Sequence, residues 1–117
     1  MAAWEDVIAL AERLPGVEVT TSYGRPAIKV RGKFMCALRT SPDAFVFRVL
    51  DVADQEALVR GNPDVFFITP HYEGYPAVLV RFTVAPDQLA ELVEDAWRLR
   101  APKRLVAEHD AATASDR

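Results

Sequence analysis

The chain has 117 residues, of which 50% are hydrophobic and 26% are charged, and this length allows one domain with a modest core but excludes two. The net charge of −3 argues against broad affinity for nucleic acid, because phosphate binding depends on positive charge. The single cysteine, Cys36, excludes an internal disulfide, and this fits a reducing compartment. The first residues are acidic where a signal peptide is basic, and no apolar run approaches the roughly 20 residues that span a bilayer. We therefore expect a cytoplasmic protein with no membrane segment.

The first half of the chain predicts one helix followed by four strands. Apolar residues at helical spacing predict a helix over residues 3–14, which Pro15-Gly16 would end. The glycine of Arg31-Gly32 allows the positive φ of a two-residue hairpin turn between the second and third strands. The four strands are expected at residues 17–22, 27–30, 33–39 and 44–50.

The second half predicts two helices and two short strands around an aromatic turn. Asp51 is placed to cap a helix that ends near Gly61, and Pro86 is placed to open the last helix. Strands at 65–68 and 77–82 flank a turn at residues 69–76 that contains prolines at both ends. The last helix carries an apolar stripe formed by Leu89, Leu92, Val93, Ala96 and Trp97.

Residues 108–117 are polar and alanine-rich without a periodic apolar face, so they predict a disordered tail after a single domain at residues 1–107. The expected order of elements is α-β-β-β-β-α-β-β-α. Short turns between successive strands imply antiparallel pairing. The sequence therefore predicts an α+β fold, a two-layer sandwich in which helices cover one face of an antiparallel sheet.

Three separated motifs carry a resemblance to a known family. They are Ser-Tyr-Gly-Arg-Pro-Ala-Ile-Lys-Val-Arg-Gly-Lys at 22–33, the segment from Gly-Asn-Pro-Asp to Val-Arg-Phe at 61–82, and Trp-Arg-Leu-Arg-Ala-Pro-Lys-Arg-Leu at 97–105. In this order they resemble the bacterial MmcQ/YjbR family over residues 4–106. The resemblance implies the same compact layered fold. It also implies DNA binding, by the family's structural similarity to a double-wing DNA-binding domain, and it supplies no catalytic residues.

Basic residues are concentrated in two stretches. Residues 23–48 hold six basic residues and one acidic residue, and residues 97–105 hold four basic residues and no acid. Strict alternation along the strands places a basic set on the outer face of the sheet, interleaved with Met35, Val46 and Leu79. That set is Lys29, Arg31, Lys33, Arg39, Arg48 and Arg81, with Arg25, Lys103 and Arg104 expected to assist.

One interpretation of this face is a platform for a nucleic acid backbone, read without strong sequence preference. The alternative is an ordinary solvated face, on which long charged side chains cover apolar surface and protect sheet edges. A protein-interaction module that uses the same open face is a further possibility, because arginines mixed with apolar side chains also suit a protein partner. We expect a monomer rather than an obligate oligomer.

The aromatic turn is the second candidate site. His71 supplies an imidazole with Glu73 two residues away, a pair that acid–base chemistry can use, while Tyr72 and Tyr75 offer rings for a base or flat ligand. No nucleophile or third group accompanies His71, so the favoured interpretation is a turn that fixes the fold or contacts a partner. We therefore expect no enzymatic activity.

The remaining site types lack their residues. One cysteine and two histidines are too few for a structural zinc site, so no metal is expected. The chain has no glycine-rich phosphate loop or dinucleotide fingerprint, so no cofactor is expected. Cys36 alternates with apolar neighbours and predicts an inert buried thiol.

Overall fold

The computed structural model describes residues 1–115 and contains one six-stranded sheet in which every neighbouring pair of strands is antiparallel. The order across the sheet is β1-β2-β3-β4-β6-β5. Along the chain the elements are α1 (Trp4–Ala11), β1 (Val17–Ser22), β2 (Arg25–Val30), β3 (Lys33–Arg39), β4 (Ala44–Arg48), α2 (Val52–Gly61), β5 (Phe66–Phe67), the 3-10 turn η1 (Pro70–Tyr72), β6 (Ala77–Val80), α3 (Pro86–Arg100) and α4 (Lys103–Ser115).

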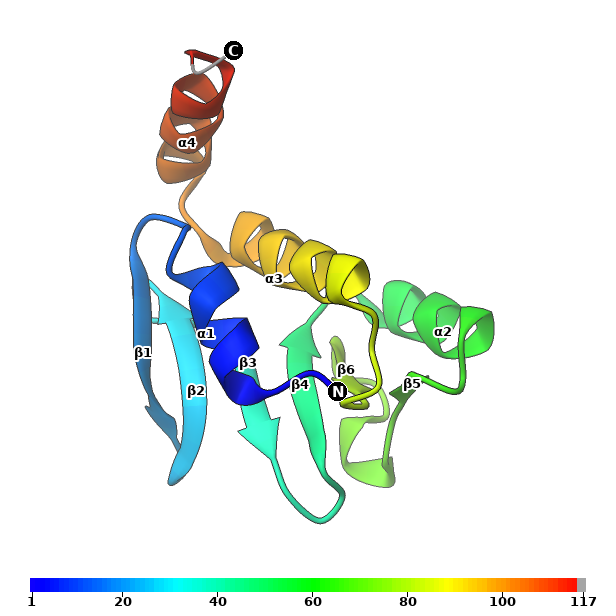
Figure 1. Ribbon diagram of the computed structural model, residues 1–117. Helices are drawn as coiled ribbons and strands as arrows, with labels where there is room; N and C mark the ends of the chain where they lie inside the picture. Colours follow the sequence, from blue (N-terminus) through cyan, green and yellow to red (C-terminus); the bar gives the residue numbers. More distant parts are fainter. Residues whose placement is uncertain (116–117) are drawn as a thin grey trace.

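Helices α1, α2 and α3 lie on one side of the sheet, and α4 projects from the body of the domain (Figure 1). The predicted α+β class and the predicted order of elements up to α3 are therefore confirmed. The main core fills the space between the helices and the inner face of the sheet. Its largest fully buried side chains are Trp97, Phe45, Phe47, Phe66, Ile28 and Met35.

Helix α3 forms as its sequence predicts. Pro86 occupies the first turn, and all five residues of the expected apolar stripe are buried. Trp97 is fully buried, and its indole Nε1 donates a hydrogen bond of 2.9 Å to the carbonyl of Pro15. A buried indole N–H needs such a partner, so this bond fixes the end of α3 against the turn that follows α1.

A β-bulge changes which side chains of β3 face the core. The pairing between β2 and β3 shifts between Ile28, which pairs with Cys36, and Lys29, which pairs with Phe34, so Met35 is an extra residue. Met35 and Cys36 are both buried in the main core, and Phe34 packs on the outer face. The prediction that Met35 faces outward was therefore wrong, because strict alternation fails at a bulge.

The hairpin predicted at Arg31-Gly32 is present. Both residues have positive φ, 49° for Arg31 and 82° for Gly32, as this kind of two-residue turn requires. Lys33 is opposite Val30, a core residue, so the bulge places Lys33 on the helix-bearing side of the sheet and not on the outer face where it was expected.

Helix α4 occupies most of the region predicted to be a disordered tail. Residues 108–115 are helical, and residues 116–117 lie outside the described part of the chain. Both guanidinium Nη atoms of Arg98 donate to the carboxylate of Asp110, at 3.1 and 2.7 Å, and the His109 ring lies edge-on to Trp97 with centroids 5.0 Å apart. A disordered tail was predicted because this segment has no apolar stripe. The polar and aromatic contacts to α3 hold the helix in place without one.

Acidification is expected to release the second half of α4. Hydrogen bonds from Arg98 hold the pKa of Asp110 below its usual 3.8, so the contact persists at neutral pH and is lost as the pH falls through that lowered pKa. Amide hydrogen exchange of residues 106–114 should show the same loss of protection at neutral pH in Asp110→Asn. Unchanged protection in this variant would contradict the role given to the Arg98 contact. Glu108→Gln is the matched control on the same helix.

Candidate functional site

The aromatic turn lies on the outer face of the sheet, so the two candidate sites are one place. A second apolar cluster on this face consists of Ala44, Val46, Ala77 and Leu79, with Phe34, Phe67 and Tyr72 packed against it. Val46 and Leu79 were expected on this face and are found there, but Tyr72 and its neighbours bury them. The outer face is therefore covered over β4 and β6 and open over β1 and β2.

Gln55 of α2 holds the turn in place. It is the one buried polar residue in the described core, with 1% of its surface exposed. Its amide nitrogen lies 3.0 Å from the carbonyl oxygen of Tyr72, 2.8 Å from that of Tyr75 and 2.6 Å from that of Ala77. The two N–H groups are thus shared among three backbone acceptors, of which the carbonyls of Tyr72 and Tyr75 also accept from the backbone N–H groups of Tyr75 and Ala77.

Three of the predicted basic residues lie against aromatic rings on this face. The guanidinium carbon of Arg39 is 5.5 Å from the Tyr72 ring centroid, that of Arg48 is 5.6 Å from Tyr75, and that of Arg81 is 4.2 Å from Phe67. Arg39 also donates a hydrogen bond of 2.9 Å to the Tyr72 hydroxyl. Such stacking orients each guanidinium group.

None of these arginines has a carboxylate partner within the described part of the chain, whose ion pairs lie on α3 and α4. The Nε atoms of Arg39 and Arg48 are buried and have no hydrogen-bond partner. A buried charged donor without a partner is costly, and its burial leaves the terminal nitrogens of the guanidinium group as the atoms that can meet an anionic ligand.

The other predicted basic residues divide between two places. Arg25 and Lys29 share the outer face of β2, where Lys29 is opposite Glu18 of β1. Arg31 lies away from this face, since its side chain and that of Leu105 both approach Gly16. Arg104 is engaged with Glu108 at 3.5 Å, and Lys103 precedes it in the first turn of α4. Arg31, Lys33, Lys103 and Arg104 therefore do not join the outer-face group.

Arg100 belongs to the site although sequence reasoning did not select it. Its Nε donates a hydrogen bond of 3.0 Å to the carbonyl of Phe34, at the edge where β3 begins. Burial lowers the pKa of Arg100, and the positive charge of Arg48 lowers it further. The high positive charge of residues 97–105 was the feature of the sequence that could have pointed to Arg100.

His71 and Glu73 are both exposed, and no hydrogen bond or ion pair joins them in the described structure. The His71 ring lies edge-on to Tyr72, with centroids 5.0 Å apart. These positions give His71 a contact with the turn and show no catalytic arrangement for it.

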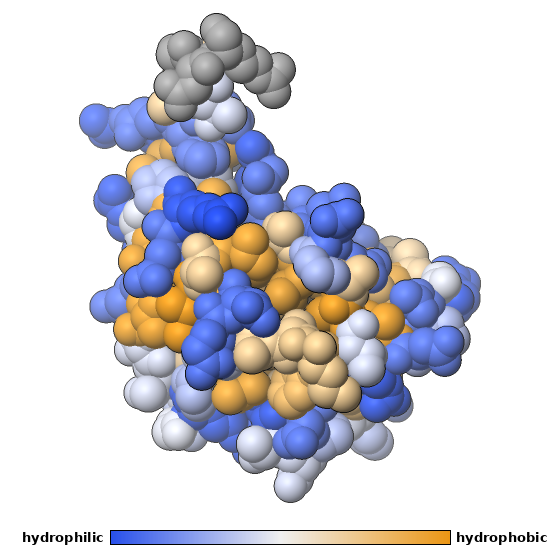
Figure 2. All heavy atoms as spheres, in the orientation of Figure 1, coloured by the Kyte–Doolittle hydropathy of each residue, from blue (hydrophilic) through white to orange (hydrophobic). Residues whose placement is uncertain are grey.

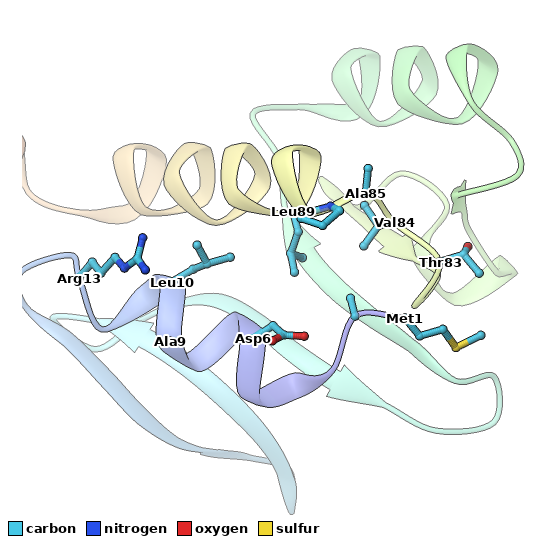
Figure 3. A pocket seen from close by; sticks show the side chains of 11 residues that line it. Met1, Asp6, Ala9, Leu10, Arg13, Thr83, Val84, Ala85 and Leu89 are labelled. Carbon is cyan, nitrogen blue, oxygen red and sulfur yellow. The ribbon is translucent and has the colours of Figure 1, made fainter.

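Two surface grooves lie elsewhere. The larger, about 650 Å³, lies between α1 and the start of α3, where Asp6, Leu10 and Arg13 line one side and Leu89 lines the other (Figure 3). Apolar surface gathers in the same region on the helix-bearing side (Figure 2). The smaller, about 210 Å³, lies beside α2. Neither groove is lined by His71, Tyr72 or Tyr75.

The thiol of Cys36 is fully buried, and this burial raises its pKa well above the usual value, in agreement with the inert thiol expected. Among residues 1–115, no helix is long and apolar enough to cross a membrane. The same residues contain no group of three or more His, Cys, Asp or Glu side chains arranged to hold a metal ion.

Comparison with known proteins supplies the family. The YjbR family model matches residues 12–99, which is most of the chain. The chain belongs to the YjbR family. The resemblance seen in the three motifs is thereby confirmed.

Curated relatives of this YjbR-family chain are the uncharacterized proteins Mb2600 of Mycobacterium bovis and Rv2570 of Mycobacterium tuberculosis. Each is 34% identical over 121 residues, which cover 91% of this chain and 94% of the relative. The crystal structure of the Deinococcus radiodurans protein DR2400, which has a DUF419 domain, superposes with a TM-score of 0.71 at 18% identity. It covers 85% of this chain and 78% of that protein, and it shows that the fold is shared.

Replacing Gln55 with leucine is expected to loosen the turn and to lower the free energy of unfolding by about 2 kcal/mol, because the carbonyls of Tyr72, Tyr75 and Ala77 each lose a hydrogen bond from the buried amide. Urea denaturation measures this loss, and exchange of the turn amides at residues 72–75 should rise with it. The matched control is Gln88→Leu on α3, where Gln88 is half-buried and makes no such contacts. Equal stability of the two variants would contradict the role of Gln55.

Proposed function

We propose that this YjbR-family protein binds the backbone of a nucleic acid strand through the outer face of its sheet, without catalysing a reaction. The proposal rests on one observation: outer-face arginines are stacked on aromatic rings and have no carboxylate partners in the described structure. Arg25 and Lys29 extend the same positive face across β2.

The aromatic residues suit this ligand as well. Arginine forks bind phosphate oxygens, and an exposed ring gives an unpaired base a surface on which to stack. Tyr75 is 42% exposed beside Arg48, so both kinds of contact are available within one small area.

The acidic remainder of the chain favours one orientation on a polyanion. Acidic residues are concentrated on the helix-bearing side, where Asp54, Glu56, Glu91 and Glu94 are exposed on α2 and α3. Segregated charge of this kind repels phosphate on one side and attracts it on the other, so a net charge of −3 is compatible with one binding face.

Binding should depend steeply on salt. If about four phosphates are neutralised, log K against log salt has a slope of about −3.6 on duplex DNA and a shallower slope on single strands. Fluorescence anisotropy with labelled duplex and single-stranded DNA, over a series of NaCl concentrations, measures this slope.

A pair of charge-matched variants tests the location of the site. Arg25→Glu, Lys29→Glu and Arg81→Glu together remove three outer-face cations, and we expect them to abolish binding. Arg13→Glu, Arg60→Glu and Lys103→Glu together change the net charge equally but lie off this face, so they should retain most of the affinity. Equal loss in both variants would contradict a defined face, and absence of wild-type binding at low salt would favour the protein-interaction alternative.

A further inference from the structure

Two arginines from separate elements lie at the same edge of the sheet, where β4 ends and β3 begins. Arg48 ends β4 opposite Ala77, and Arg100 ends α3 and reaches the first residues of β3 through its bond to the Phe34 carbonyl. Tyr75 belongs to the aromatic turn, and its ring centroid is 5.6 Å from the Arg48 guanidinium carbon.

The positive charge at this edge is not neutralised by the described residues around it. The ion pairs of the described chain involve Arg98 and Arg104, and neither Arg48 nor Arg100 takes part in one. The Nε of Arg48 is buried without a partner, whereas the Nε of Arg100 is satisfied by the backbone. Positive charges at one edge of the sheet repel each other, and an anion between or beside them relieves this repulsion.

The geometry also selects the kind of anion. The bond to Phe34 occupies the Nε of Arg100 and leaves its terminal nitrogens free, and the guanidinium carbon of Arg48 lies 5.6 Å from the Tyr75 ring centroid. Two oriented forks match the several oxygens of a phosphate group better than they match a single hydroxyl or carbonyl.

We propose that Arg48 and Arg100 form a clamp for one phosphate group, beside which Tyr75 offers its ring to an attached base. The phosphate can belong to a nucleic acid strand or to a free phosphorylated compound, and in the first case the clamp rests on the proposed function. Arg100 is then a binding residue that the strand alternation could not identify.

Lysine substitutions test the clamp, because they keep the charge and remove the planar fork. Arg48→Lys and Arg100→Lys should each weaken binding of a 5′-phosphorylated single-stranded oligonucleotide about tenfold. Arg98→Lys is the matched control: Arg98 lies on the same helix, two residues away, and pairs with Glu94 and Asp110. The double variant should bind no more weakly than the poorer single variant, since both arginines hold one group.

A measurement on the wild-type protein avoids any folding defect of the variants. The Nε–Hε resonances of Arg48 and Arg100 in ¹⁵N-labelled protein should shift with millimolar inorganic phosphate and not with chloride at equal ionic strength. Failure of both resonances to respond would overturn the clamp, as would lysine variants that bind like Arg98→Lys.

The two proposals fail in distinguishable ways. If phosphate shifts these resonances but no oligonucleotide binds, the clamp proposal holds, with a free phosphorylated compound as the ligand, and the proposed function fails. If oligonucleotides bind with the expected salt dependence and the lysine variants are unaffected, the proposed function stands and the clamp fails. If both proposals hold, comparing the affinities of oligonucleotides with and without the 5′-phosphate shows whether the clamp binds the end of a strand or an internal phosphate.

Discussion

The arrangement of the outer face depends on a single side-chain amide, that of Gln55. Its nitrogen lies within 3.0 Å of three backbone carbonyls and so fixes residues 72–77 across β4 and β6. The rings of Tyr72 and Tyr75 then take positions against which Arg39 and Arg48 stack. A buried polar contact on α2, on one side of the sheet, thereby sets the position of cations on the other side. The interaction is directional, whereas the apolar core around it tolerates many packings.

The two faces of the sheet show how much of the structure could be predicted from the sequence. Helix α3, the cap at Asp51 and the hairpin at Arg31-Gly32 follow local rules, and the structure contains all three. The bulge at Met35 has no local signature, yet it reverses the side chains of residues 33–35 relative to strict alternation. Strict alternation therefore placed Lys33 correctly in β3 but on the wrong side of the sheet. Helix α4 was missed for a related reason, since its contacts to α3 are tertiary and polar.

The candidate site was predictable in its parts and not in its assembly. Basic strand residues and an aromatic turn were both visible in the sequence, but 33 residues separate Arg39 from Tyr72, and no periodicity relates them. The structure unites them because the turn folds back over the outer face. Arg100 could not be found by alternation at all, since it reaches the edge of the sheet, at the Phe34 carbonyl, from the end of a helix. The resulting surface combines oriented cations with partly exposed rings, which suits a phosphate-bearing ligand.

The central claim is that the outer face, and not the groove between α1 and α3, is the binding surface. Chemical-shift mapping of ¹⁵N-labelled protein with a short single-stranded oligonucleotide tests this most directly. The account predicts that the perturbed amides and arginine side chains will cluster at Lys29, Arg48, Tyr75 and Arg81, and that Leu10 and Leu89 in the groove of Figure 3 will be unaffected. Perturbations concentrated in that groove, or spread evenly over both layers, would contradict it.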